Sequence, residues 1–215
     1  MTPAEIEEMA RRRYNAVNDT FWAQDEIFDM IYAACLEICD EGHAVERVYT
    51  TPTVASTQGY DFPTNAISVK RITYEGVKLT PMDMRDDDAL TAMNQNTTST
   101  GTPAYYWIWD RTIYLRPVPA AVGTLKIWTY NKQNEISAAT TTIEIPGQHH
   151  ARLINPVLSG MAAKDSNFKA ADWYLKLWEQ DKVRIKMSMR KMKRADGFAT
   201  VKDESLVIES RIGGP

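Results

Sequence analysis

Few residues of this sequence could do catalytic chemistry, and their spacing does not bring them together. No glycine-rich nucleotide loop, HExxH motif or GxSxG motif occurs in the 215 residues. His149 and His150 are adjacent, so on a helix they would point roughly 100° apart and could not share a metal ion. Cys35 and Cys39 are four residues apart in an expected helix, where reduced, packed thiols are the usual outcome. We therefore expect a protein that is not an enzyme and holds no cofactor or metal.

A short acidic run, Asp86-Asp87-Asp88, could bind a hard cation, because carboxylate oxygens are the ligands of Ca²⁺ and Mg²⁺. The run lacks the alternating spacing and the glycine of a calcium-binding loop, so a solvated turn is the favoured interpretation. It lies in a polar, turn-rich stretch from 83 to 103, where we expect a long loop.

The segment 182–194 is strongly basic, with seven lysine or arginine residues and no acidic residue. This density would suit phosphate groups, so DNA contact is one interpretation. A favourable cationic end for a long helix is another. We prefer a third, docking against an acidic surface of a partner, because the charges surround the helix and alternate with Met187, Met189 and Met192.

Two helices are expected at the N-terminal end of the chain. Thr2-Pro3-Ala4-Glu5 is a capping box that begins a helix reaching about Val17. A second helix is expected over 21–41, and Gly42 is a suitable residue to end it. Joined by a short connection, the two helices would pack as an antiparallel hairpin.

Strand periodicity replaces helical periodicity in the middle of the chain. Runs of β-branched and aromatic residues, bounded by Gly, Pro, Asn or Asp, recur from Arg47 to Tyr130 and indicate an antiparallel β domain. Residues 105–109 and 112–115, separated by Asp110-Arg111, predict a tight hairpin with aromatic cross-strand pairs.

Two more helices are expected after residue 146. The first covers 147–163 and contains Pro156, which should bend or interrupt it. The last runs over 167–195, a length of about 43 Å. Because a compact chain of this size has a radius of gyration of ~17 Å, such a helix spans the domain or protrudes from it.

The last helix and the segment after it are the expected partner-binding region. The helix has an apolar seam with 4,3 spacing, in which Trp178, Ile185 and Met189 take part. An extended segment of the length that follows could reach ~66 Å, far enough to contact a neighbouring chain. The residues expected to bind a partner are Trp178, Ile185, Lys186, Met189, Arg190, Met192, Lys193, Arg194, Phe198, Leu206, Val207 and Ile208.

Together these patterns predict an α+β fold. Residues 1–45 and 146–196 would form a helical bundle with two N-terminal and two C-terminal helices. Residues 46–145 would form a central antiparallel β domain inserted into the bundle, and residues 197–215 an extended C-terminal tail.

Charge is separated along the sequence. Residues 1–100 carry 17 acidic and 8 basic side chains, and residues 101–215 carry 11 and 17, for a net charge of −3. Such polarity suits subunits that stack against unlike neighbours. No run approaches the roughly 20 apolar residues of a membrane span, and the acidic N-terminus does not resemble a signal peptide, so we expect a cytosolic product without a membrane partner.

Several short motifs between residues 20 and 165 occur in the order found in a known protein family. They are Phe21-Trp22, Thr53-Val54-Ala55, Gln58-x-Tyr60-x-Phe62-Pro63, Ile67-x-Val69-Lys70-Arg71-Ile72, Gly101-Thr102-Pro103, Leu115-Arg116-Pro117-Val118-Pro119 and Ile145-Pro146. Each motif is short, and their order carries the likeness. The chain resembles the head-to-tail adaptor, or connector, proteins of podophages and related tailed phages.

This resemblance implies a structural virion protein of the head–tail junction, synthesised in the cytoplasm of a bacterial host. The family implies a ring, commonly of twelve copies, that joins the portal protein to the tail nozzle or tail tube and continues the DNA channel. DNA would pass without sequence-specific binding along an acidic lumen, while the basic helix and the tail face the portal. Asp86, Asp87 and Asp88 would then lie in a loop that faces the tail.

Three alternatives stay open on the sequence. A neck, stopper or tail-completion protein would form a similar ring one level lower in the particle. A carbohydrate-binding module is favoured only by Tyr105, Tyr106, Trp107 and Trp109, half of which alternate into a core if they form a strand. A hydrolase that uses Asp and Glu lacks any paired-carboxylate motif.

Overall fold

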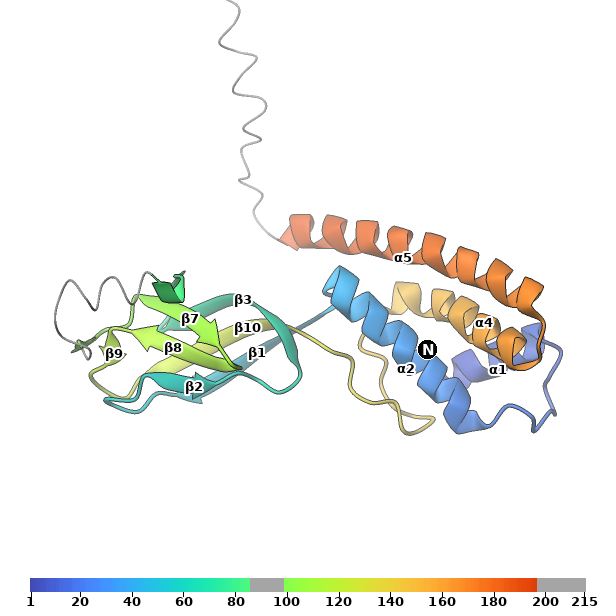
Figure 1. The fold of residues 1–215 in the computed structure, drawn as a ribbon, viewed down its shortest axis with the longest axis horizontal. Helices are drawn as coiled ribbons and strands as arrows, with labels where there is room; N and C mark the ends of the chain where they lie inside the picture. Colours follow the sequence, from blue (N-terminus) through green and yellow to red (C-terminus); the bar gives the residue numbers. More distant parts are fainter. Residues whose placement is uncertain (86–98, 197–215) are drawn as a thin grey trace, which may run out of the picture.

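The computed structural model describes residues 1–85 and 99–196, with side chains as far as Met192. Helices lie at both ends of the described sequence and strands lie between them, which confirms a mixed helix and sheet protein compatible with the α+β class. Figure 1 shows a helical part and a β part arranged end to end. The predicted C-terminal tail, 197–215, lies outside the described residues, and the predicted domain boundaries stay a prediction.

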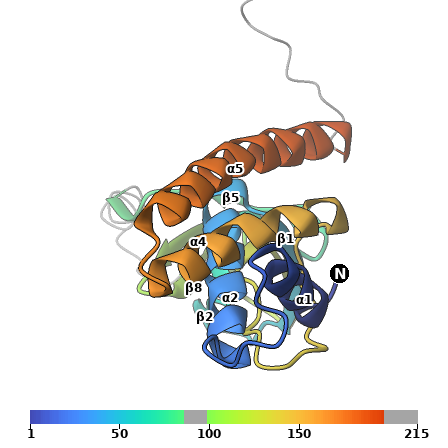
Figure 2. The same ribbon diagram turned by 90° about the vertical axis from the view of Figure 1, so that its right-hand side faces the viewer.

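The helices contribute side chains to one shared hydrophobic cluster. They are α1 (Pro3–Arg13), α2 (Gln24–Gly42), the 3₁₀-helix η1 (Gly147–Leu153), α4 (Ile154–Lys164) and α5 (Phe168–Asp196). Figure 2 shows α5 at one side of the helical part, crossing above α4. The last helix is therefore as long as its sequence predicts, at 29 residues.

The capping box predicted at the start of the chain is present. The Glu5 backbone N–H donates to Thr2 Oγ1 at 3.3 Å, and the Thr2 N–H donates to Glu5 Oε2 at 3.0 Å. The helix ends at Arg13 rather than near Val17, because Asn15 adopts a left-handed conformation with φ of 58°.

Pro156 does not interrupt a helix as expected. The chain forms the 3₁₀-helix η1 up to Leu153 and becomes α-helical only at Ile154, so Pro156 occupies the first turn of α4. Backbone N–H groups in a first turn have no partner within the helix, and a proline there costs no hydrogen bond.

The β part consists of two four-stranded sheets and one short pair. In sheet A the strand order is β1 (Val45–Pro52), β10 (Thr124–Asn131), β3 (Ala66–Tyr74) and β4 (Val77–Lys78). In sheet B it is β2 (Gly59–Asp61), β8 (Thr112–Arg116), β7 (Tyr105–Trp109) and β5 (Thr80–Pro81). The short pair consists of β6 (Thr100–Gly101) and β9 (Val118–Pro119). Most of these pairs are antiparallel, as predicted. The β5–β7 and β6–β9 pairs are parallel, which the alternation of side chains could not indicate.

The predicted aromatic hairpin is confirmed. β7 and β8 are antiparallel, with Trp109 opposite Thr112 and Trp107 opposite Tyr114. Both turn residues, Asp110 and Arg111, have positive φ angles, 44° and 57°, which is the geometry of a turn that matches the twist of paired strands. The Trp107 and Tyr114 rings are stacked with their centroids 5.3 Å apart.

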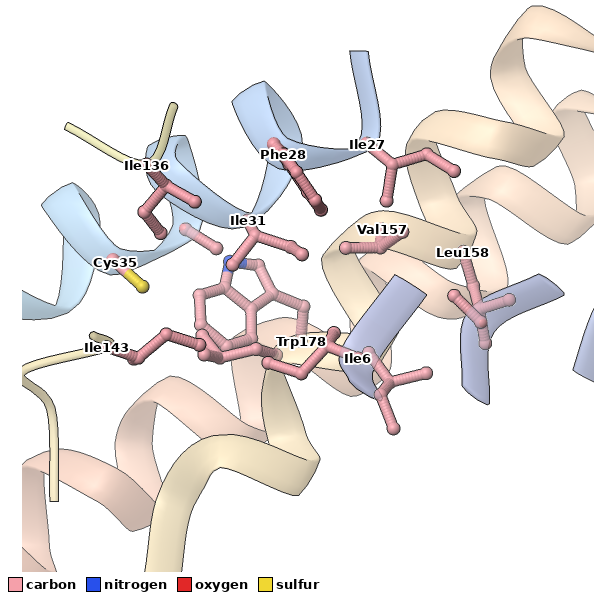
Figure 3. Close-up of a cluster of buried hydrophobic side chains, with 14 of the residues drawn as sticks. Ile6, Ile27, Phe28, Ile31, Cys35, Ile136, Ile143, Val157, Leu158 and Trp178 are labelled. Carbon is pink, nitrogen blue, oxygen red and sulfur yellow. The ribbon is translucent and has the colours of Figure 1, made fainter. Parts of the chain in front are cut away.

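Two separate hydrophobic clusters stabilise the two parts. The β cluster lies between the sheets and includes Ile72, Ile113, Leu115, Leu125 and Ile127. The helical cluster contains Trp178, and Figure 3 shows its indole among side chains that include Ile31, Cys35 and Ile143.

The chain crosses between the two parts twice. The first crossing is the short link between α2 and β1, where the His43 ring stacks on Tyr130 of β10 at 4.4 Å. The second follows β10, and its residues Ile136, Ile143 and Ile145 pack into the helical cluster. These isoleucines therefore belong with the helices in space, although the sequence placed them in the β domain.

Candidate partner-binding surface on the last helix

One face of α5 is fixed inside the helical part. Trp178, Ile185 and Met189 are only 2%, 1% and 4% exposed, and they recur every seven or four residues along the helix. The Trp178 indole Nε1 also donates a hydrogen bond to Glu37 Oε2 of α2 at 3.0 Å. These three side chains, which the sequence predicts to bind a partner, therefore lie in the core of their own chain.

Ion pairs hold α5 to α2 beside this apolar face. The Lys182 ammonium lies 2.8 Å from Glu179, 3.1 Å from Glu37 and 3.9 Å from Glu41, and Lys186 lies 3.6 Å from Glu41. Burial alone would lower the pKa of Lys182, but its hydrogen bonds to Glu179 and Glu37 outweigh burial and raise it. Part of the basic segment is thus neutralised within the chain.

A second set of contacts joins α5 to η1 and α4. Asp181 is 6% exposed, and its carboxylate accepts hydrogen bonds from Arg152 and, at 2.7 Å, from Asn155 Nδ2. Arg184 lies 3.7 Å from the same carboxylate. The buried charge of Asp181 is therefore paired on two sides, as a buried carboxylate requires.

The opposite face of α5 is exposed, and two of its side chains contact neighbours in the same helix: the Trp173 ring meets Tyr174 edge-on at 4.9 Å, and Lys176 pairs with Asp172 at 2.6 Å. We call this face the outward stripe and define it by residues spaced alternately three and four apart: Trp173, Lys176, Gln180, Val183, Met187 and Arg190. Trp173, Val183 and Met187 are 56%, 53% and 59% exposed. Exposed apolar side chains in line on one helix face are typical of a surface that another chain covers.

The other predicted partner-binding residues fall into three groups. Arg190 and Met192 are exposed, and the Met192 sulfur accepts a hydrogen bond from Gln148 at 3.4 Å. Lys193 and Arg194 lie in the last turns of α5, beyond the last side chain that the structure describes. Phe198, Leu206, Val207 and Ile208 lie outside the described ranges, as do Asp86, Asp87 and Asp88 of the predicted tail-facing loop.

Of the outward stripe, sequence reasoning named only Arg190 among the partner-binding residues and Met187 within the basic segment. Trp173, Val183 and Met187 follow the same alternation of three and four residues as the buried seam, displaced around the helix. A helix with two such apolar lines can have a core on one side and a partner on the other. The second apolar line in the sequence is therefore the pattern that indicates the outward stripe.

The adjacent histidines of η1, His149 and His150, and the two cysteines are buried. His150 Nε2 lies 2.6 Å from the carbonyl of Ile145, and its Nδ1 lies 3.1 Å from the terminal amine of Met1. Burial, with smaller effects from Arg152 and His150, lowers the pKa of His149. Within residues 1–85 and 99–196, no group of three His, Cys, Asp or Glu side chains could hold a metal ion.

In the part of the chain that the structure describes, no helix combines the length and the apolar character needed to cross a membrane.

Comparison with known proteins gives one result that covers nearly the whole chain. Residues 1–199 match the family model described as SU10 adaptor protein. None of the curated proteins compared with the chain matches it. Because the family match includes both the helices and the β part, the resemblance to phage adaptors is confirmed, and the chain belongs to the SU10 adaptor protein family, a family of phage head-to-tail adaptors.

Proposed function

We propose that this adaptor is a structural subunit of the phage neck that forms a ring, of twelve copies, between the portal and the tail. The ring continues the DNA channel, and the portal protein and the tail nozzle or tail tube are its partners. Family membership supports the adaptor role, and the exposed outward stripe of α5 is the observation that supports a protein partner.

The outward stripe is suited to docking for a physical reason. The buried seam and the ion pairs of Lys182 and Asp181 fix the helix, so little conformational entropy is lost when a partner binds it. Trp173, Val183 and Met187 supply apolar area, and Arg190 supplies positive charge for an acidic partner.

Co-sedimentation with purified portal rings tests this proposal. The double variant Val183→Asp/Met187→Asp should fold normally but lose at least about tenfold in affinity for the portal, because two carboxylates would be desolvated in the interface. A chain that ends at Ala195 tests the tail separately, and it should fold but form no ring on portals.

A matched control changes two exposed apolar residues of the β part, Val54→Asp/Val122→Asp, which are 58% and 72% exposed in the wild type. This control should bind portals as the wild type does. Unchanged portal binding by the α5 double variant would reject the outward stripe as the docking surface. Binding to tail rings instead of portals would favour the alternative of a neck, stopper or tail-completion protein.

The carbohydrate-binding alternative depends on the aromatic strand β7. Tyr105 and Trp109 are 44% and 61% exposed, whereas Trp107 is 9% exposed and stacks on Tyr114. Strand alternation directs Tyr106 to the other face, where it packs against the β cluster. Family membership favours the adaptor role over this alternative.

A further inference from the structure

The outer face of sheet A is basic. Strand alternation directs Ile72, Leu125 and Ile127 into the β cluster, so their neighbours point outward. The register places Arg71 opposite Trp128 and places Thr73 between Lys126 of β10 and Lys78 of β4. Paired residues of neighbouring strands point to the same side of a sheet, and these five side chains therefore share one face.

Four cations gather on this face, which we call the basic sheet face and define by Lys70, Arg71, Lys78, Lys126 and Trp128. Lys70 precedes Arg71 directly but lies on the same side, because the register of β3 and β10 shifts by one residue there. All four cations are exposed, and three of them line a pocket of ≈ 340 Å³ with Trp128. Lys70 forms an ion pair with Glu46 at 2.7 Å. Arg71, Lys78 and Lys126 form no ion pair with any residue in the described ranges, so their charges are available to a ligand.

Aromatic rings restrain two of these charges. The Arg71 guanidinium lies 4.3 Å from the centroid of the Trp128 ring, and Lys70 Nζ lies 5.8 Å from that of Tyr130. A cation that is already positioned over a ring loses less side-chain entropy when it binds an anion. Beneath them, Thr73 is 1% exposed, and its hydroxyl has no hydrogen-bond partner within the described part of the chain.

We propose that the basic sheet face binds the phosphodiester backbone of duplex DNA without sequence specificity. Arg71, Lys78 and Lys126 would neutralise phosphates along the backbone and release counterions. A protein partner fits less well, because lysine is depleted from the centre of protein interfaces whereas it dominates this face. The inference goes beyond the proposed ring, since it assigns a DNA contact to residues outside α5.

Fluorescence anisotropy of a short labelled duplex, titrated with the full chain at two salt concentrations, tests the proposal. The triple variant Arg71→Gln/Lys78→Gln/Lys126→Gln should bind at least about tenfold more weakly than the wild type at low salt. Its plot of log affinity against log salt should also be shallower by about 2 to 3, because each lost phosphate contact removes about 0.9 from the slope.

The matched control removes three exposed cations of α5 instead, in the variant Lys169→Gln/Arg190→Gln/Lys191→Gln. It should retain wild-type affinity for the duplex within about twofold. Equal weakening in both variants, or weakening in the α5 variant alone, would overturn the proposal. Tighter binding of poly-L-glutamate than of the duplex at the same salt would also overturn it, in favour of an acidic protein surface.

Discussion

Charged side chains of the helical part contact one another rather than an open site. The Lys182 ammonium forms ion pairs with Glu37 and Glu179, and the Asp181 carboxylate accepts hydrogen bonds from Arg152 and Asn155. Removing one partner of such a group leaves the other charge desolvated, which costs more free energy than the pair itself provides. The same residues that the sequence offers as a basic docking segment are therefore partly committed to holding α5 in place.

The two cysteines give a prediction at this scale. Burial, with a smaller contribution from Cys39, raises the pKa of Cys35, and burial, with a smaller contribution from Glu144, raises the pKa of Cys39 to about 11. Since the thiolate is the reactive form, neither thiol should react with dithionitrobenzoate at about pH 8 while the chain is folded. Release of two equivalents in urea and none in buffer is the expected result, and rapid release from the folded chain would contradict it.

At the scale of the element, α5 has two faces with different roles. Among the side chains that the structure describes, the inward face buries Trp178, Ile185 and Met189, whereas the outward stripe exposes Trp173, Val183 and Met187 to solvent. A single helix can therefore be fixed by its own chain and still offer an apolar line to another chain.

Two tryptophans of α5 provide a matched test of these faces. Trp178→Ala should lower the free energy of unfolding by about 3 to 5 kcal/mol, because it leaves a cavity in the helical cluster and removes the hydrogen bond to Glu37. Trp173→Ala, on the exposed face, should change it by no more than about 0.5 kcal/mol. Urea unfolding followed by helical circular dichroism measures both, and equal losses would show that the two faces are not distinct.

The sequence predicts most elements, because local rules fix them. The capping box at Thr2, the hairpin at Asp110-Arg111 and the length of the last helix all depend on neighbours in the sequence. The end of α1 depends on one left-handed residue, Asn15, and the parallel β5–β7 pair depends on contacts distant in the sequence. Neither leaves a periodic signal.

The candidate site was harder to predict than the fold. An apolar seam with 4,3 spacing shows that a helix buries one side. It does not show whether the side chains that pack against this side belong to the same chain or to another. The seam therefore predicts a partner for Trp178 and Ile185, although α2 and α4 of the same chain cover them. The partner-binding role of the residues beyond Met192 stays a prediction.

At the scale of the whole molecule, both hydrophobic clusters are complete within one chain. The helical cluster and the β cluster each enclose their own apolar side chains. In the outward stripe, Lys176, Gln180 and Arg190 alternate with the apolar residues, so two free copies would gain little buried apolar area from pairing.

We therefore predict that the purified chain is a monomer that assembles only on a portal template. Light scattering should give the mass of a single chain without portal and a ring-bound mass after portal is added, because the preformed ring presents many docking sites at once. A stable ring formed by the chain alone would contradict this prediction. Portal rings preincubated with an unrelated basic protein serve as the control.

The two crossings between the helical and β parts leave from the same end of neighbouring strands. β1 begins at Val45 and β10 ends at Asn131, and these two residues are opposite each other in the register. Tension that separates the parts would therefore pull both strands lengthwise and in the same direction. Because β10 also pairs with β3, the force would act as shear between these two strands. The backbone hydrogen bonds between β10 and β3 would then share the load instead of opening one after another.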